Sequence, residues 1–473
     1  CVTSNCLCQG RLQDPKITPQ TKDNSDNQDI NGVPGPVVLT KDGQIKGITV
    51  DKAHVFYGIP YADPPVGAYR WKPPRPVSPW AGVYDASFPR AVSEDCLYLN
   101  IFVPLDVNFS SPLWSPLPVM VWIHGGDFIA GSASKPLYDG RFISNFTHTV
   151  IVNLEYRLGA FGFLVSGKDP HTSAAGNYGI LDQQAALLWV QRNIAVFGGD
   201  PSKVTIFGES AGAQSASLHL MIQSSKPLFK QAVLQTVPLA CECVAVKVIT
   251  CLHEQSQGQP RFLRLYNLNI WLDEMMVGAL KDIEIRNKKS LCFKYHLICL
   301  KIMFMGPTYC LLYLPQIVTD YVFLCPSRRS ARAGTVAGSN VWMYVFDHIA
   351  SDHRVWSGLS FCYQHACHGA ELPFLFDSAS VANFTLSPPE KLLSNRMLCY
   401  WGAFAHTGDP SSRVHQTTFC REQRLFFFYF YSRVSLCPSL IVKMSDKLKE
   451  INERQTKQIG HIFPHRCMAQ SSS

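Results

Sequence analysis

The chain has 473 residues, of which 47% are hydrophobic and 16% are charged. This composition excludes disordered, collagen-like and coiled-coil chains, which are more polar or more periodic. The net charge of +8 is a small excess for so large a surface, and the sequence has no arginine-rich arm, zinc-finger spacing or alternation of aromatic and basic residues. We therefore expect a globular protein with a large core and no nucleic-acid partner.

Seventeen cysteines are many for a cytosolic protein, and their odd number leaves at least one thiol without a partner in the chain. Three Asn-x-Ser/Thr sequons begin at Asn108, Asn145 and Asn383. Cysteines and sequons together favour a secreted or secretory-pathway protein, with glycans predicted at these three asparagines. No signal peptide is visible in the sequence, which begins at Cys1.

The N-terminal part divides into a leader and an ordered region. Residues 1–36 are polar and rich in Asp, Asn, Gln and Pro, which is typical of a flexible leader. Val37–Leu39, a turn at Lys41–Gly43, and Ile45 together predict a β-hairpin. The proline-rich run that ends at Trp80 excludes regular helix and indicates an ordered surface loop.

Buried strands then alternate with amphipathic helices. Short apolar runs predict strands, and apolar residues at helical spacing or a run of small residues predict helices. The strands are expected at 97–103, 118–123, 149–154 and 203–207, and the helices at 181–193 and 210–221. This order predicts an α/β fold with a large, mostly parallel central sheet flanked by helices.

Two regions depart from this texture, at 237–316 and 425–473. The first holds six cysteines and runs into an apolar stretch at 296–318, long enough for a membrane span but interrupted by Lys301 and by Gly306-Pro307. A membrane span is therefore not expected. We predict a leader (1–36), one domain (37–424) with an atypical insert (237–316), and an atypical C-terminal tail (425–473).

The chemistry is clearest in the stretch Gly-Glu-Ser-Ala-Gly at 208–212, which follows the apolar strand 204–207 and precedes a helix of small residues. This is the context of a nucleophile elbow, a tight strand-to-helix turn that exposes a serine. The flanking glycines leave room for the neighbouring backbone. Ser210 is therefore the candidate nucleophile, with the N-terminus of the following helix behind it.

A second glycine-rich turn, His124-Gly125-Gly126, follows the strand 118–123. The backbone N–H groups of Gly125 and Gly126, with that of Ala211 after the nucleophile, are candidates for an oxyanion hole. A serine in an elbow also needs a general base, which lies downstream in this fold. The downstream histidines include His365, His368, His406 and His415, and a glycine that allows a sharp turn follows His368.

Several long motifs resemble the type-B carboxylesterase/lipase family, which includes the cholinesterases and belongs to the α/β-hydrolase superfamily. The stretch 94–104 (Glu-Asp-Cys-Leu-Tyr-Leu-Asn-Ile-Phe-Val-Pro) is similar to one family signature, and 197–212 is similar to the serine signature. The stretches 176–184 and 400–410 also resemble family blocks. The resemblance covers about 37–236 and 317–424.

The resemblance implies an α/β-hydrolase fold whose lid and pocket region is truncated or replaced. It implies Ser210 as the acyl-forming nucleophile, His368 as the general base, and Gly125, Gly126 and Ala211 around the oxyanion hole. It also implies structural ion pairs between Arg157 and Asp182 and between Arg70 and Glu94. Neither a cofactor nor a metal is needed for this chemistry.

The departures from the family pattern bear on activity and substrate. The family's third glycine is replaced by Asp127. The triad acid falls in the insert, where no motif identifies it; the candidates are Glu254, Asp273, Glu274, Asp282 and Glu284. Cys96 normally pairs with an upstream cysteine in a loop that is missing here, and the tryptophan of the choline site lies in that loop, which argues against a choline ester.

The sequence thus predicts a serine hydrolase that cleaves small carboxylic esters through an acyl-enzyme. Its activity is expected to be impaired if the triad acid is absent, because neutralising that acid costs about 10⁴ in turnover in a well-studied protease. Two alternatives stay open. One is a catalytically impaired or inactive cholinesterase-like interaction or adhesion protein, and the other is a non-functional truncated product.

Overall fold

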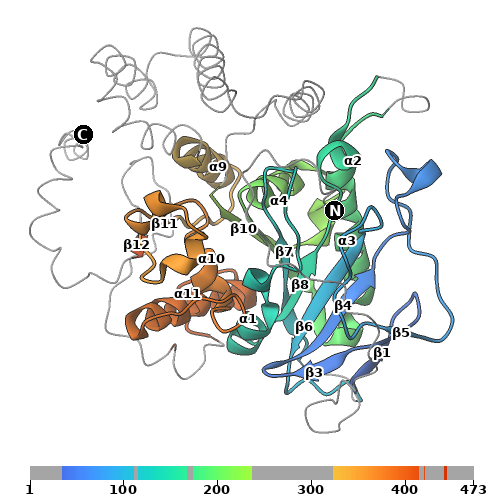
Figure 1. Cartoon of the computed structure of the whole chain (residues 1–473), viewed down its shortest axis with the longest axis horizontal. Coiled ribbons are helices and arrows are strands. Elements are labelled where there is room, and N and C mark those ends of the chain that lie inside the picture. The colour runs from blue at the N-terminus through green and yellow to red at the C-terminus, as the bar shows by residue number, and fades with distance from the viewer. Residues whose placement is uncertain are drawn as a thin grey trace, which may run out of the picture.

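A computed structural model describes residues 35–110, 115–167, 174–236, 323–414, 420 and 442–444. Its centre is a seven-stranded sheet with the order β10-β9-β7-β8-β6-β4-β3 (Figure 1). The strands are β3 (Ile48–Val50), β4 (Ala53–Pro60), β6 (Tyr98–Pro104), β7 (Leu117–Ile123), β8 (Val150–Leu154), β9 (Gly199–Glu209) and β10 (Gln231–Gln235). The expected α/β-hydrolase fold is confirmed by this sheet and its flanking helices.

The sheet is mixed, with its parallel strands grouped together. The neighbours β10, β9, β7 and β8 pair in parallel, whereas β6, β4 and β3 join by antiparallel pairings. The predicted parallel arrangement is therefore found in the half of the sheet that contains β9, and the other half is antiparallel. The carboxyl ends of these parallel strands share one edge of the sheet, which is where ligands bind in open α/β folds.

Two small sheets accompany the central one. The predicted N-terminal hairpin is confirmed, since β1 (Val37–Leu39) pairs antiparallel with β2 (Gln44–Lys46), and β5 (Val83–Asp85) adds a third strand. The proline-rich loop runs from β4 to β5, and its one helical element is the 3₁₀ turn η1 (Gly67–Tyr69). A second pair joins β11 (Tyr344–Phe346) to β12 (Val442–Met444) in parallel.

Helices pack on both faces of the central sheet. On one face lie α1 (Gly140–Thr147), α10 (Leu372–Phe376) and α11 (Pro388–Thr407), and on the other lie α3 (Tyr178–Asn193) and α4 (Ala211–Met221). The remaining described helices are α2 (Gly159–Phe163) and α9 (Cys325–Val336), with 3₁₀ helices η2 (Pro136–Tyr138), η3 (Ile194–Phe197), η4 (Lys226–Leu228), η6 (His353–Trp356) and η7 (Ser360–Tyr363).

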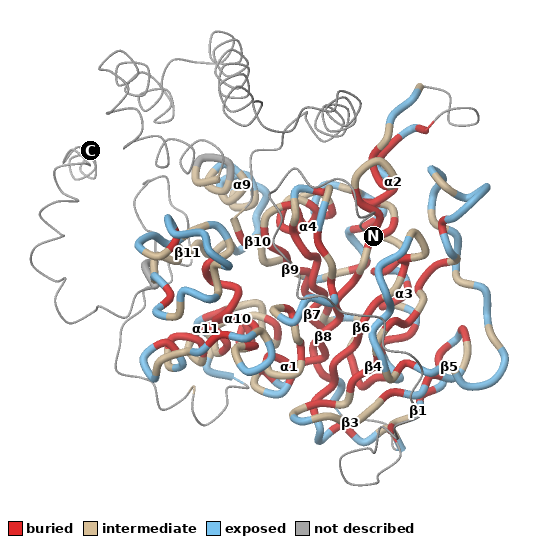
Figure 2. Tube along the Cα trace, viewed as in Figure 1, coloured by how far each residue is buried: buried red, intermediate tan, exposed pale blue. Residues whose placement is uncertain are grey.

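The core forms two layers because successive side chains of a strand point to opposite faces. In β7, Val119, Val121 and Ile123 pack in one layer, and Met120 and Trp122 pack in the other. All seven residues of β7 are buried. Figure 2 shows that the buried backbone is concentrated in these central strands. The strand that leads into the first glycine-rich turn is thus held from both sides.

Both ion pairs implied by the family resemblance are present. Arg157 and Asp182 are fully buried, and their side chains approach to 2.7 Å. Arg157 also donates to the carbonyl oxygen of Lys72, so the pair joins the end of β8, α3 and the proline-rich loop. The guanidinium of Arg70 makes two contacts with the carboxylate of Glu94.

Other sequence predictions fall outside the described residues. These include the leader to residue 34, the insert and its apolar run to residue 322, and most of the tail. Among the residues that the structure describes, no helix is long and apolar enough to cross a membrane. The predicted domain boundaries therefore stay predictions.

Candidate active site

Ser210 lies at the turn between β9 and α4, at the edge of the sheet formed by the parallel strands. Its backbone angles, φ 58° and ψ −121°, belong to a region that residues other than glycine rarely adopt. The Ser210 N–H donates a hydrogen bond of 3.0 Å to the carbonyl oxygen of Gln235, the last residue of β10. The side chain is partly exposed. The turn therefore has the geometry of a nucleophile elbow.

The glycines on either side of Ser210 are required by close packing. A Cβ atom at Gly212 would lie 1.9 Å from the carbonyl oxygen of Ile123, and one at Gly208 would lie 2.6 Å from the same oxygen. Any larger residue would push β7 away from the turn. The two glycines of the Gly-x-Ser-x-Gly pattern thus allow the turn at Ser210 to pack closely against the end of β7.

The turn after β7 lies beside the elbow. A Cβ atom at Gly125 would lie 3.0 Å from the Cβ of Ser210, so this backbone passes directly next to the candidate nucleophile. The N–H groups of Gly125, Gly126 and Ala211 donate no backbone hydrogen bond to the described residues. Unpaired amides beside a serine are the donors that an oxyanion hole needs.

Asp127, at the position of the family's third glycine, has a positive φ. Its φ is 58° and that of Phe128 is 60°, which place both in the left-handed region. Asp tolerates this region better than most residues. Gly126 (φ 122°) has a conformation that only glycine adopts readily, and its carbonyl oxygen accepts hydrogen bonds from Ile129 and Ala130.

His368 reaches the same edge of the sheet from a distant part of the chain. Its Nε2 lies 2.9 Å from Oε1 of Glu209, the residue before Ser210. The contact lacks the geometry of a hydrogen bond, so the two groups form an ion pair when His368 is protonated. The His368 side chain is 39% exposed and that of Glu209 only 7%. Gly369 turns the chain just after His368 with a φ of 81°.

The environment of His368 favours its protonated form. Burial alone would lower the pKa of His368, but the nearby carboxylate of Glu209, and more weakly the charges of Glu371 and Asp127, raise it above its ordinary value. The ring of Phe323 stacks on the imidazole with the ring centroids 4.8 Å apart. The site therefore stabilises an imidazolium, the species that forms when a histidine acts as a base.

Glu371 is a second buried carboxyl group close to this site. It is 4% exposed, and its Oε1 accepts a hydrogen bond of 3.1 Å from Nε2 of Gln235. Burial and the charge of Glu209 raise the pKa of Glu371 to about 7. Glu371 is therefore only partly ionised near neutral pH.

The structure brings together some of the predicted residues. The turn that carries Ser210 and Ala211 lies beside the turn at Gly125 and Gly126. His368 reaches these turns through its contact with Glu209. Among the described residues no hydrogen bond joins Ser210 Oγ to another group, and Nε2 of His368 contacts Glu209 instead. Of the other histidines considered, His365 contacts the Phe361 carbonyl and His406 that of Thr147, and His415 lies outside the described residues.

Glu209 is the residue that the sequence analysis missed. It lies inside the Gly-x-Ser-x-Gly motif at the variable position, where the motif requires no acid. Its charge was the only available signal. The candidate triad acids Glu254, Asp273, Glu274, Asp282 and Glu284 all lie outside the described residues.

The described residues contain no group of three or more His, Cys, Asp and Glu side chains that could hold a metal ion. The sequon asparagines Asn108, Asn145 and Asn383 are all exposed. Two disulfides join Cys362 to Cys367 and Cys399 to Cys420. Cys96 is disulfide-bonded as well, and the upstream cysteines Cys1, Cys6 and Cys8 lie outside the described residues.

Comparisons with known proteins agree with this geometry. The model of the carboxylesterase family matches residues 34–250 and 312–425. The chain is 32% identical to acetylcholinesterase of Bungarus fasciatus, over 79% of this chain and 78% of the relative. It is 44% identical to acetylcholinesterase of Electrophorus electricus, over 43% of this chain and 36% of the relative. A solved structure of PNB esterase aligns with a TM-score of 0.60 at 29% identity, covering 80% of this chain and 92% of that chain.

Proposed function

Because the chain belongs to the carboxylesterase family, we propose that it is a serine hydrolase that cleaves small carboxylic esters through an acyl-enzyme intermediate. Ser210 Oγ attacks the ester carbonyl carbon while His368 accepts the hydroxyl proton. The oxyanion of the tetrahedral intermediate accepts hydrogen bonds from the N–H groups of Gly125, Gly126 and Ala211. His368 then protonates the leaving alcohol, and a water molecule deprotonated by His368 releases the carboxylic acid.

Glu209 has a defined part in this scheme. When His368 takes the proton from Ser210, the imidazole becomes a cation, and the carboxylate 2.9 Å from Nε2 stabilises it. For the transfer itself a ring nitrogen must turn toward Ser210 Oγ, since Nε2 contacts Glu209 in this structure.

One observation carries the proposal, namely the backbone conformation of Ser210 beside the turn at Gly125. A serine at φ 58° and ψ −121° is strained, and such strain persists only where the surrounding packing imposes it. Here the imposed conformation holds Ser210 where the backbone of Gly125 passes close to its Cβ, beside amides that donate no backbone hydrogen bond to the described residues. In acyl transfer, such amides can stabilise the oxyanion that forms when the serine attacks an ester.

A fluorophosphonate probe tests the nucleophile directly, because labelling requires only an activated serine. We expect the full chain to be labelled and to hydrolyse p-nitrophenyl acetate, and Ser210→Ala to lose both activities. Ser202→Ala changes an exposed serine on the same strand and serves as the matched control. Labelling that persists in Ser210→Ala, or a folded chain that is never labelled, would refute the proposal; the second result would favour an interaction protein without turnover.

We further propose that the protein follows the secretory route and carries N-linked glycans. The support is the exposure of the three sequon asparagines, the disulfides of the described residues, and the similarity to acetylcholinesterases. Disulfides persist in oxidising compartments and are rare in the cytosol.

A further inference from the structure

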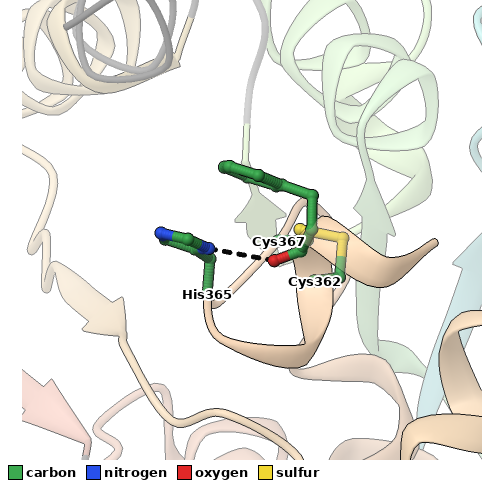
Figure 3. Close-up of a disulfide and its surroundings, with 4 residues drawn as sticks. Cys362, His365 and Cys367 are labelled. Carbon is green, nitrogen blue, oxygen red and sulfur yellow. Dashed lines mark hydrogen bonds between the residues drawn. A yellow bond between two sulfur atoms is a disulfide. The ribbon is translucent and has the colours of Figure 1, made fainter. Parts of the chain in front are cut away.

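The segment that leads to His368 is closed by a disulfide. Cys362, in the 3₁₀ helix η7, is bonded to Cys367, the residue immediately before His368 (Figure 3). Between the two cysteines, residues 364–366 are exposed. Cys362 itself is buried, with 6% exposure. The disulfide therefore joins Cys367, the residue next to the candidate base, to the buried Cys362 five residues earlier in the chain.

His368 is held differently on its two sides. On the C-terminal side, Gly369 and Ala370 lead to the buried Glu371 and to α10, all of whose residues are buried. The Ala370 N–H also donates a hydrogen bond of 3.0 Å to the carbonyl oxygen of Cys367. On the N-terminal side the comparable anchor is the covalent bond to Cys362.

The other contacts of the loop lie at the surface. His365 contacts the carbonyl oxygen of Phe361 at 2.9 Å through Nδ1, as the dashed line in Figure 3 marks. The rings of Phe361 and His365 are stacked with centroids 4.2 Å apart, yet both residues are exposed. Tyr363, which is half-buried, stacks on the exposed ring of His353 in η6. None of these contacts ties Cys367 to the core.

We propose that the Cys362–Cys367 disulfide is a positioning element of the active site, which holds the His368 imidazole against Glu209 beside Ser210. This inference rests on the proposed esterase function. The cysteines touch no reacting atom and act through the backbone of His368. A displacement of about 1 Å of a catalytic group can cost about 10²-fold in rate, so an exposed loop held on this side only by surface contacts would be a poor support for a base.

The double variant Cys362→Ala/Cys367→Ala, called the clamp variant below, tests the proposal. We expect kcat for p-nitrophenyl acetate to fall about 10- to 100-fold with little change in KM, because the nucleophile and the oxyanion hole remain in place. The matched control is Cys399→Ala/Cys420→Ala, which removes the disulfide that starts from α11. Equal kcat in the clamp variant and in wild type, or an equal loss in the control, would overturn the inference.

A second measurement does not depend on turnover. Titration of the histidines by nuclear magnetic resonance, with His368 assigned through His368→Gln, reports how closely the imidazole is held to Glu209. We expect the pKa of His368 to lie above its ordinary value in wild type and to move toward that value in the clamp variant. An unchanged His368 titration would overturn the inference even if the esterase reaction is confirmed.

The two proposals fail in different ways. If wild type is neither labelled by fluorophosphonate nor active, the esterase proposal fails, and the His368 titration still decides whether the disulfide holds the ring. If the clamp variant does not fold, folded wild type is treated with a water-soluble phosphine, and mass spectrometry identifies which cysteines are reduced. Loss of kcat that follows reduction of Cys362 and Cys367 supports the inference, and full activity after their reduction contradicts it.

Discussion

Glu209 precedes Ser210 in the sequence, yet its carboxylate points to a histidine more than 150 residues away. Its side chain is nearly buried and lies 2.9 Å from Nε2 of His368. A carboxylate in such surroundings acts strongly on a neighbouring cation because little water screens it. At the scale of single residues, Glu209 is therefore the main charge that raises the pKa of His368 against the opposing effect of burial.

We predict that Glu209→Gln shifts the pH profile of kcat/KM to lower pH. Glu209 raises the pKa of His368, so its removal lowers that pKa, and the neutral imidazole that acts as the base then persists in more acidic solution. The maximal kcat should fall about 10- to 100-fold, because the imidazolium loses its counter-charge.

The control for this prediction is Asp127→Asn, which removes a weaker and exposed charge that also acts on His368. Its profile should move in the same direction by a smaller amount. An acid limb that stays in place in Glu209→Gln, measured over pH 5 to 9, would show that Glu209 does not govern the base.

Among the elements, α11 illustrates how one buried carboxylate orders a helix start and two loops. Glu390 forms a capping box with Ser387, and it also accepts hydrogen bonds from the backbone and the hydroxyl of Ser351. Burial disfavours its ionised form, but the donors from Ser351 and Ser387, with His348, lower the pKa of Glu390 to about 2. The N-terminus of α11 is thus tied to the segment after β11.

We predict that Glu390→Gln destabilises the protein by about 1–3 kcal/mol at neutral pH. The folded-state pKa lies below the unfolded value of about 4.3, so the ionised carboxylate stabilises the fold above that value, and this contribution is lost as the pH falls toward 2. Urea unfolding between pH 3 and pH 8 measures the effect. The difference from wild type should shrink in acid.

Glu371→Gln provides the opposite control for this measurement. The pKa of Glu371 is raised to about 7, so this group destabilises the fold as the pH rises from about 4 toward 7. The free energy of unfolding that Glu371→Gln gains over wild type should therefore be larger in neutral and alkaline solution than in acid. The same pH trend for both variants would contradict these assignments.

At the scale of the whole molecule, the predicted glycans occupy separate elements. Asn108 follows β6, Asn145 lies on α1, and Asn383 precedes α11. All three side chains are exposed, although the sequon residue Thr147 is buried. The surface can therefore carry glycans without opening either layer of the core.

We predict that the chain secreted by animal cells loses mass on treatment with peptide N-glycosidase F. Asn108→Gln and Ser110→Ala should remove the same glycan, because each destroys the same sequon. Intact mass spectrometry checks both variants. A secreted chain whose mass is unchanged by the glycosidase would contradict the prediction.

Local features of the sequence were sufficient to predict the fold and the strand-to-helix turn at Ser210. The apolar run at 118–123 predicted β7, and the glycines around Ser210 predicted the elbow, because backbone conformation and side-chain alternation depend on neighbours in the chain. The ion pair between Arg157 and Asp182 was accessible only through resemblance to a family.

Tertiary structure alone decided three features of the site. They are the contact of His368 with Glu209, the disulfide between Cys362 and Cys367, and the raised pKa of Glu371. The sequence by itself determined which turn exposes a serine and which segments form the sheet. It could not determine which distant charges meet at that turn, because their separation depends on the order of the strands and on how α10 packs against them. Charge interactions change steeply with distance and burial, and only the folded chain sets both.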